Sequence, residues 1–98
     1  MIKHIAFFKM KDEAMGNSGI VNARLMSDKF QDLMGKIETL KSIETGINVN
    51  DEKYDLCLYC EFENQAGLES YLRHPAHLEL RNYVFQVIDH REVVDYSV

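Results

Sequence analysis

The sequence has 98 residues, which is the size of one small domain, and we expect a single domain over residues 1–98. Hydrophobic residues make up 46% of the chain, enough for a core, while the net charge of −5 argues against nonspecific binding to nucleic acid or to an anionic membrane surface. No apolar run is long enough to span a membrane and the N-terminus lacks the layout of a signal peptide, so we expect a cytoplasmic protein.

The first expected element is a β-strand over residues 3–11, because apolar side chains occur on both faces of an alternating pattern. One face carries the even-numbered side chains Ile2, His4, Ala6, Phe8 and Met10, and the other carries Ile5 and Phe7. A sheet with one wet face would alternate apolar and polar residues, so this strand needs cover on both sides.

A connection over residues 12–19 follows, in which Asn17 or Ser18 can cap the next helix. Apolar residues then recur at helical spacing from about residue 20 to residue 40, which predicts a helix of five to six turns. Gly35 weakens this helix only locally.

The second half of the chain predicts two strands, two helices and a final strand. We expect strands over 42–50, with a β-bulge at Gly46, and over 55–63, joined by a polar turn at 50–53. Asn64 caps a short helix that ends near residue 73, Pro75 begins a longer helix that ends near residue 89, and a last strand covers 91–98.

The order βαββαβ predicts an α+β protomer of ferredoxin-like type, with a four-stranded antiparallel sheet and helices on one face. The open face of the sheet then needs a partner, and a two-fold homodimer that packs sheet against sheet is the simplest cover. The expected lining of that face is Ile5, Phe7, Cys57 and Tyr59.

Cys57 and Cys60 form a C-x-x-C pattern, but they fall in a predicted strand. Residues three apart in a strand point to opposite faces, whereas a redox or zinc motif needs its cysteines together. We therefore expect two free thiols, and we predict no cofactor and no metal.

Residues 71–77 form a joint between the two C-terminal helices and hold the candidate catalytic residues. Tyr71 and His77 lie on apolar helical stripes on either side of Pro75, so both side chains should point inward, where His4 lies on the same inner face. Burial and the first turn of a helix keep His77 neutral, the form that a general base needs, and Tyr71 can donate a hydrogen bond to a carbonyl or enolate oxygen. The same side chains could instead satisfy one another in the core.

Four segments of the chain together resemble the stress-responsive α/β barrel family (Dabb, dimeric α/β barrel). They cover residues 1–13, 54–64, 71–79 and 92–98, and the most specific parts are Tyr71 with residues 74–77 and the segment 93–96. The resemblance implies a ferredoxin-like protomer and a dimer whose two sheets close into a barrel. Members often carry a proline-glycine pair before the second strand; residues 41–46 lack it, which leaves the shape of that loop open.

The resemblance also implies a function for the joint. Some plant members are polyketide cyclases that use a tyrosine and a histidine of this joint and a histidine of the first strand, which match Tyr71, His77 and His4. Three functions follow as expectations. The protein is a homodimer that binds a small apolar or carbonyl-containing molecule between sheet and helices, a cofactor-free enzyme of polyketide-cyclase or antibiotic-monooxygenase type, or a structural, stress-related dimer without a ligand.

Overall fold

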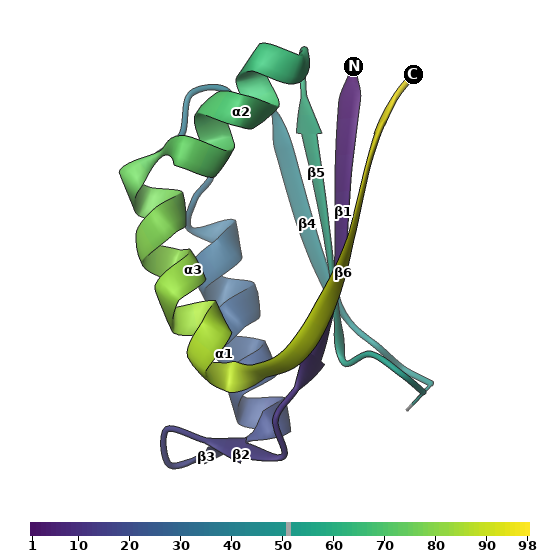
Figure 1. Ribbon diagram of the computed structural model, residues 1–98, viewed down its shortest axis with the longest axis vertical. Coiled ribbons are helices and arrows are strands. Elements are labelled where there is room, and N and C mark those ends of the chain that lie inside the picture. Colours follow the sequence, from purple (N-terminus) through teal and green to yellow (C-terminus); the bar gives the residue numbers. More distant parts are fainter. Residues whose placement is uncertain (51) are drawn as a thin grey trace.

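The computed structural model describes residues 1–50 and 52–98 of the chain. A four-stranded antiparallel sheet, in the order β4-β5-β1-β6, forms one layer, and helices cover one of its faces (Figure 1). Its strands are β1 (Ile2–Met10), β4 (Ser42–Ile47), β5 (Leu56–Phe62) and β6 (Ile88–Ser97). The helices are α1 (Gly19–Gln31), α2 (Gln65–Arg73) and α3 (Pro75–Val87). This architecture confirms the predicted ferredoxin-like α+β fold.

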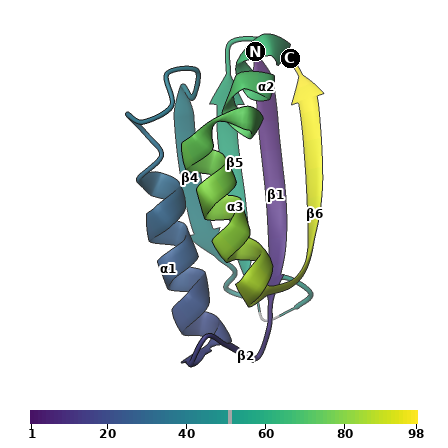
Figure 2. The ribbon, with the colours of Figure 1, turned by 60° about the vertical axis from the view of Figure 1, so that its left-hand side comes forward.

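The two termini run side by side as the neighbouring strands β1 and β6, and α2 and α3 lie on the same side of the sheet as α1 (Figure 2). Along β1, buried side chains alternate with half-buried ones, as the two-sided strand pattern predicted. The buried face, which includes Ala6 and Phe8, forms the core against the helices. The half-buried face carries Ile5 and Phe7, and no helix of the described part of the chain covers it.

The first helix is shorter than predicted. It begins after the Ser18 cap, whose Oγ accepts a hydrogen bond from the backbone N–H of Val21, and it ends at Gln31 instead of residue 40. Tight turns follow, and Gly35 adopts φ +90°, a value outside the helical region. The turns still bury Leu33, Ile37 and Leu40. The helical spacing of these apolar residues therefore predicted their burial correctly, but not the helix itself.

The predicted bulge at Gly46 is wrong, because β4 pairs with β5 in unbroken register from Ser42 to Ile47. A register shift occurs instead between Lys9 and Met10, where β1 meets β6. The connection after β1 contains a short hairpin of β2 (Glu13–Ala14) and β3 (Asn17–Ser18), which was expected only as a loop. The polar turn predicted over 50–53 includes residue 51, which lies outside the described residues.

Both cysteines are free, as predicted: Cys60 is buried on the helix side of β5, and Cys57 is half-buried on the other face. Within residues 1–50 and 52–98, no helix has the length and apolar character needed to cross a membrane.

Candidate functional site

The joint at residues 74 and 75 directs both C-terminal helices toward the sheet. His74 has an extended backbone, with φ −65° and ψ 137°, and it ends α2 and caps α3. Its Nδ1 accepts a hydrogen bond of 3.1 Å from the backbone N–H of Ala76, and Pro75 begins α3, where no N–H is needed.

This joint brings the three predicted site residues together between the sheet and the helices. The ring centroids of Tyr71 and His77 are 4.5 Å apart, and those of His4 and Tyr71 are 6.1 Å apart. All three side chains are buried, with exposed fractions of 6% for His4, 0% for Tyr71 and 9% for His77. The predicted convergence is therefore confirmed, whereas the roles of these residues in catalysis stay predictions.

Tyr71 and His77 do not form a hydrogen bond with each other. The Tyr71 Oη and the His77 Nδ1 are buried, and within residues 1–50 and 52–98 neither makes a hydrogen bond of good geometry, although the Cys60 thiol lies beside the Tyr71 hydroxyl and the Leu72 backbone lies beside the His77 ring. A buried polar atom without a partner costs about 1–3 kcal/mol of stability. The two atoms are thus free to bond a third molecule, and the expectation that the two side chains satisfy each other is wrong.

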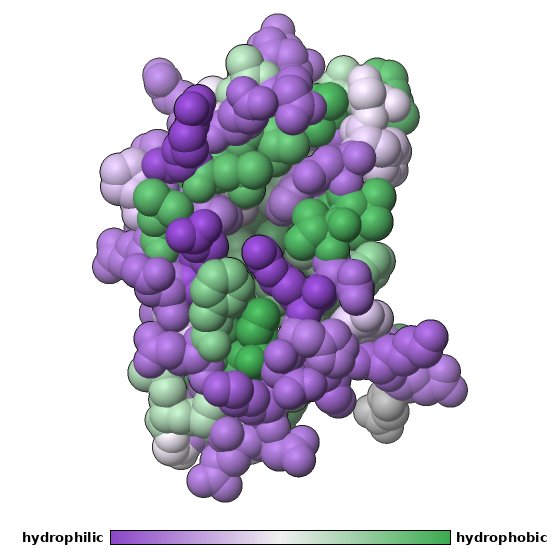
Figure 3. Space-filling view, viewed as in Figure 1, coloured by the Kyte–Doolittle hydropathy of each residue, from purple (hydrophilic) through white to green (hydrophobic). Residues whose placement is uncertain are grey.

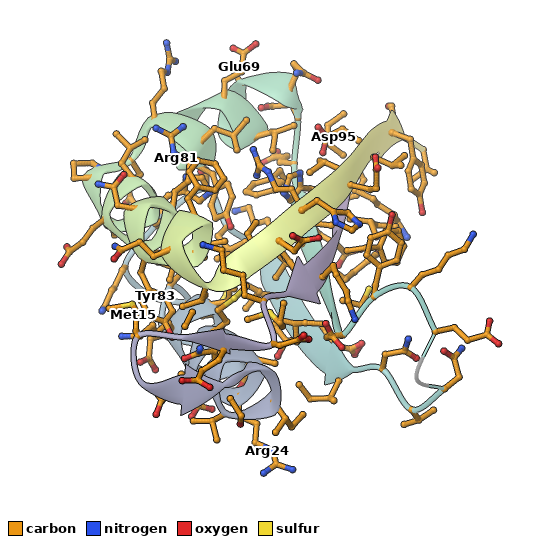
Figure 4. All side chains as sticks on the ribbon, turned by 60° about the horizontal axis from the view of Figure 1, so that its bottom comes forward. Met15, Arg24, Glu69, Arg81, Tyr83 and Asp95 are labelled. Atoms are coloured by element: carbon orange, nitrogen blue, oxygen red, sulfur yellow. The ribbon has the colours of Figure 1, made fainter. Side chains whose placement is uncertain are left out.

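His4 has an acidic partner that the sequence analysis missed. Its Nδ1 lies 2.5 Å from the Asp95 Oδ1, because the antiparallel register of β1 and β6 sets the two residues opposite each other. When the imidazole is neutral, the carboxylate accepts the Nδ1–H and leaves the lone pair on Nε2. Asp95 on β6 is labelled in Figure 4. Its only sequence signal was the segment 93–96, which carried part of the family resemblance.

Burial fixes the protonation states of the other two groups. It lowers the pKa of His77 to about 4, the Leu72 backbone opposes this shift, and electrostatic interactions with His4, Arg81 and Arg91 add to it. Burial also raises the pKa of Tyr71 above its usual range, and the neighbouring Cys60 adds to that shift. Near neutral pH His77 is therefore neutral, as predicted, and Tyr71 keeps its proton as a hydrogen-bond donor.

A small cavity of about 20 Å³ opens beside His4 and His77, and Tyr71 packs behind these two rings and outside the cavity lining. That volume is enough for roughly one water molecule. Its lining comes from β1, β5, β6, α1 and α3, and consists of His4, Ala6, Phe8, Phe30, Leu58, His77, Arg81, Val84 and Arg91. A larger pocket of about 500 Å³ lies elsewhere, on the other face of the sheet, where Phe7 and Cys57 belong to its lining.

The arrangement suits proton transfer next to a carbonyl group. An imidazole held by a carboxylate can accept a proton, and a buried phenol can donate a hydrogen bond to the oxygen where negative charge develops. Both groups work best in an apolar, water-poor layer such as this one.

The sequence matches the stress responsive A/B barrel domain over residues 2–98. It is 33% identical over 79 residues, 79% of both chains, to an uncharacterized protein of Streptomyces coelicolor. A dimeric protein of unknown function with a ferredoxin-like fold from Bacteroides fragilis is 28% identical, with a TM-score of 0.87, over 99% of this chain and 95% of that chain. A hydroxynitrile lyase from Passiflora edulis shares the fold at 14% identity, with a TM-score of 0.82, over 99% and 92% of the two chains. The family match, which spans nearly the whole chain, and the shared architecture lead to one conclusion: this protein belongs to the stress responsive A/B barrel domain family.

Proposed function

We propose that the protein is a homodimer that binds a small carbonyl-containing molecule between sheet and helices and transfers a proton beside the carbonyl, without a cofactor. The observation that carries this proposal is the pair of unpartnered buried atoms, the Tyr71 Oη and the His77 Nδ1. They lie beside His4, which Asp95 holds in place. Polar groups that converge in an apolar layer and leave hydrogen bonds unmade are typical of a small-molecule site.

We assign the base to His4 and not to His77. A base is most effective when its pKa lies near the working pH, and burial lowers the pKa of His77 to about 4. His4 instead has a carboxylate partner that accepts its Nδ1–H and orients the ring, which leaves the Nε2 lone pair to take a proton. In this assignment Tyr71 donates a hydrogen bond to the ligand oxygen, and His77 holds the ligand.

The dimer is part of the proposal for two reasons. The open face of the sheet carries apolar residues such as Ile5 and Phe7 that are only half-buried in a single chain. The similar Bacteroides fragilis protein is described as dimeric. The hydroxynitrile lyase carries its activity on the same fold, but at 14% identity that activity is not transferred to this chain.

Deuterium exchange tests the proposed chemistry. Levulinate, a ketone acid, is incubated with the protein in D₂O, and deuterium entry at the carbons beside the ketone is followed by proton NMR. We expect the protein to accelerate the exchange, and we expect His4→Gln, Tyr71→Phe and Asp95→Ala each to reduce the protein-dependent rate by about tenfold or more.

Asp89→Ala is the matched control for Asp95→Ala. Asp89 also lies on β6, and its Oδ2 is 2.9 Å from the Nδ1 of an exposed histidine, His90, away from the cavity. This variant should exchange at the wild-type rate. A wild-type protein that neither accelerates exchange nor shifts its Tyr71 and His77 ring signals with levulinate would exclude the proposal.

A second candidate function is a structural dimer without a ligand, which the small cavity of about 20 Å³ favours. A ligand larger than water must displace side chains at the rim before it can bind. Thermal unfolding with and without levulinate separates the two functions, because a structural dimer gives no ligand-dependent shift of its unfolding midpoint. The oxygenase alternative stays a prediction.

A further inference from the structure

We infer that the ligand of this site carries a carboxylate, which Arg81 and Arg91 bind at the rim of the cavity. This inference rests on the proposed function and deepens it, since it names the charge of the ligand and the residues that select for it.

The two arginines reach the rim from different elements. Arg81, which is labelled in Figure 4, lies on α3 four residues after His77, and this spacing places both residues on one face of the helix. Arg91 lies on β6 four residues before Asp95, so it shares the sheet face that points toward the helices. Both arginines line the cavity together with His4 and His77. The two guanidinium groups therefore flank the same opening from the helix side and the sheet side.

A shared aromatic ring holds the two cations near each other. The guanidinium carbon of Arg81 lies 5.8 Å from the centroid of the Phe85 ring, and that of Arg91 lies 5.1 Å from the same centroid. Cation–π contacts of this kind orient a guanidinium without neutralising it. Phe85 is itself exposed, so the cluster remains open to solvent on the outside.

Neither arginine forms an ion pair with any residue in 1–50 or 52–98, although the chain has an excess of five negative charges. Asp95, which lies on the same face of β6 as Arg91, is paired with His4. Two guanidinium groups that contact one ring without a counterion repel each other, and an anion bound by both reduces that cost. The pair is thus suited to bind an anion at the entrance to an apolar layer.

A carboxylate is the anion that fits this arrangement together with the rest of the site. Guanidinium groups bind carboxylates through two parallel N–H···O bonds, which fix the orientation of the ligand. A carboxylate at the rim leaves the remainder of the molecule to extend inward toward His4 and His77, which line the cavity. The same positive charges stabilise an enolate formed there.

The rim is also where the site can open. Both arginine side chains are exposed, and Figure 3 shows a hollow in the molecular surface with strongly hydrophilic side chains around it. Long exposed side chains change rotamer at little cost in free energy, whereas the buried side chains of the lining are held by close packing. Movement of the two arginines toward a bound carboxylate would therefore enlarge the cavity without repacking the core.

A matched pair of probes tests the inference: levulinate, which carries a carboxylate, and methyl levulinate, in which an ester replaces it. Binding is measured by NMR titration of the wild type and of the double variant Arg81→Gln/Arg91→Gln, at constant ionic strength. We expect the wild type to bind levulinate at least about tenfold more tightly than the ester, and we expect the double variant to lose that preference. Arg24→Gln/Arg73→Gln removes the same charge at two other exposed positions and should keep the preference.

The outcomes separate the inference from the function on which it rests. Equal binding of the two probes by the wild type, or a preference that survives in Arg81→Gln/Arg91→Gln, would overturn the carboxylate clamp and leave the proposed function standing. Failure of both probes to bind the wild type would overturn both. Loss of the preference in the Arg24→Gln/Arg73→Gln control would show that overall charge, and not the rim, selects the ligand.

Discussion

At the scale of single residues, burial gives the two inner histidines different chemistry. His4 is buried with a carboxylate partner, whereas the buried Nδ1 of His77 has no partner among the described residues. The carboxylate orients the His4 ring, whereas burial lowers the pKa of His77. A pair of histidines that read alike in the sequence can therefore divide the work of a site between base and ligand contact.

The lowered pKa of His77 makes a prediction about stability and pH. The pKa of His77 is about 4 in the folded chain, whereas the ordinary value of 6.5 applies in the unfolded chain. The unfolded chain therefore binds the proton more readily. The contribution of neutral His77 is complete above pH 6.5 and is lost as the pH falls toward 4, by on the order of 3 kcal/mol. Urea unfolding between pH 6.5 and 4.5 should show this slope in the wild type and a flatter slope in His77→Gln.

His90→Gln is the control for that experiment, because His90 is exposed and its replacement should leave the slope unchanged. Protein concentration must be held constant, since dimer formation also contributes to apparent stability. Identical slopes for the wild type and His77→Gln would contradict the assignment of a low pKa to His77.

The sequence predicted the three inner side chains of the site but not the charged ones. His4 followed from strand alternation, and Tyr71 and His77 followed from helical spacing, all of which are local properties. Asp95, Arg81 and Arg91 depend on which strand pairs with β1, in what register, and which helix lies over that pair. The pairing of β1 with β6 contains a register shift between Lys9 and Met10. Counting residues along the two strands from their connection therefore does not give the correct partners.

At the scale of elements, the end of α1 shows where apolar periodicity misleads. Leu33, Ile37 and Leu40 continue the helical spacing, yet they are buried by successive turns. Gly35 allows the chain to form these turns, because φ +90° is a conformation that residues with a Cβ rarely adopt. The sequence signal for the end of the helix was this glycine, which was judged too weak a break.

Gly35→Ala should therefore destabilise the protein by about 1 kcal/mol. A Cβ at this position would meet no atom within 4 Å, so the cost comes from the backbone conformation alone. Gly46→Ala is the matched control, since its Cβ also meets nothing within 4 Å and its φ lies outside the left-handed region. We expect that variant to stay within about 0.5 kcal/mol of the wild type in urea unfolding. Equal effects of the two substitutions would show that the turn at Gly35 does not need its positive φ.

At the scale of the whole molecule, the two faces of the sheet differ: the helices pack against one face, and the other is uncovered in the described part of a single chain. The helices cover the face that carries His4, and the apolar residues of the other face remain partly exposed in a single chain. Alternation in β1 and β5 predicted this division because strand periodicity assigns each residue to a face. The identity of the cover could not follow from that pattern, since it depends on the surface of another molecule.

Val94 offers a direct test of the proposed dimer. It pairs with Ile5 in the register of β1 and β6, so both side chains lie on the open face, and Val94 is 52% exposed in the single chain. Val94→Glu should leave the protomer folded by circular dichroism but place like charges across a two-fold interface, so light scattering at micromolar concentration should report one chain mass instead of two. Ile20→Glu, which alters a side chain of similar exposure (44%) on α1, should remain dimeric. A monomeric wild type, or a Val94→Glu variant that still dimerises, would mean that something other than a second copy of the chain covers this face.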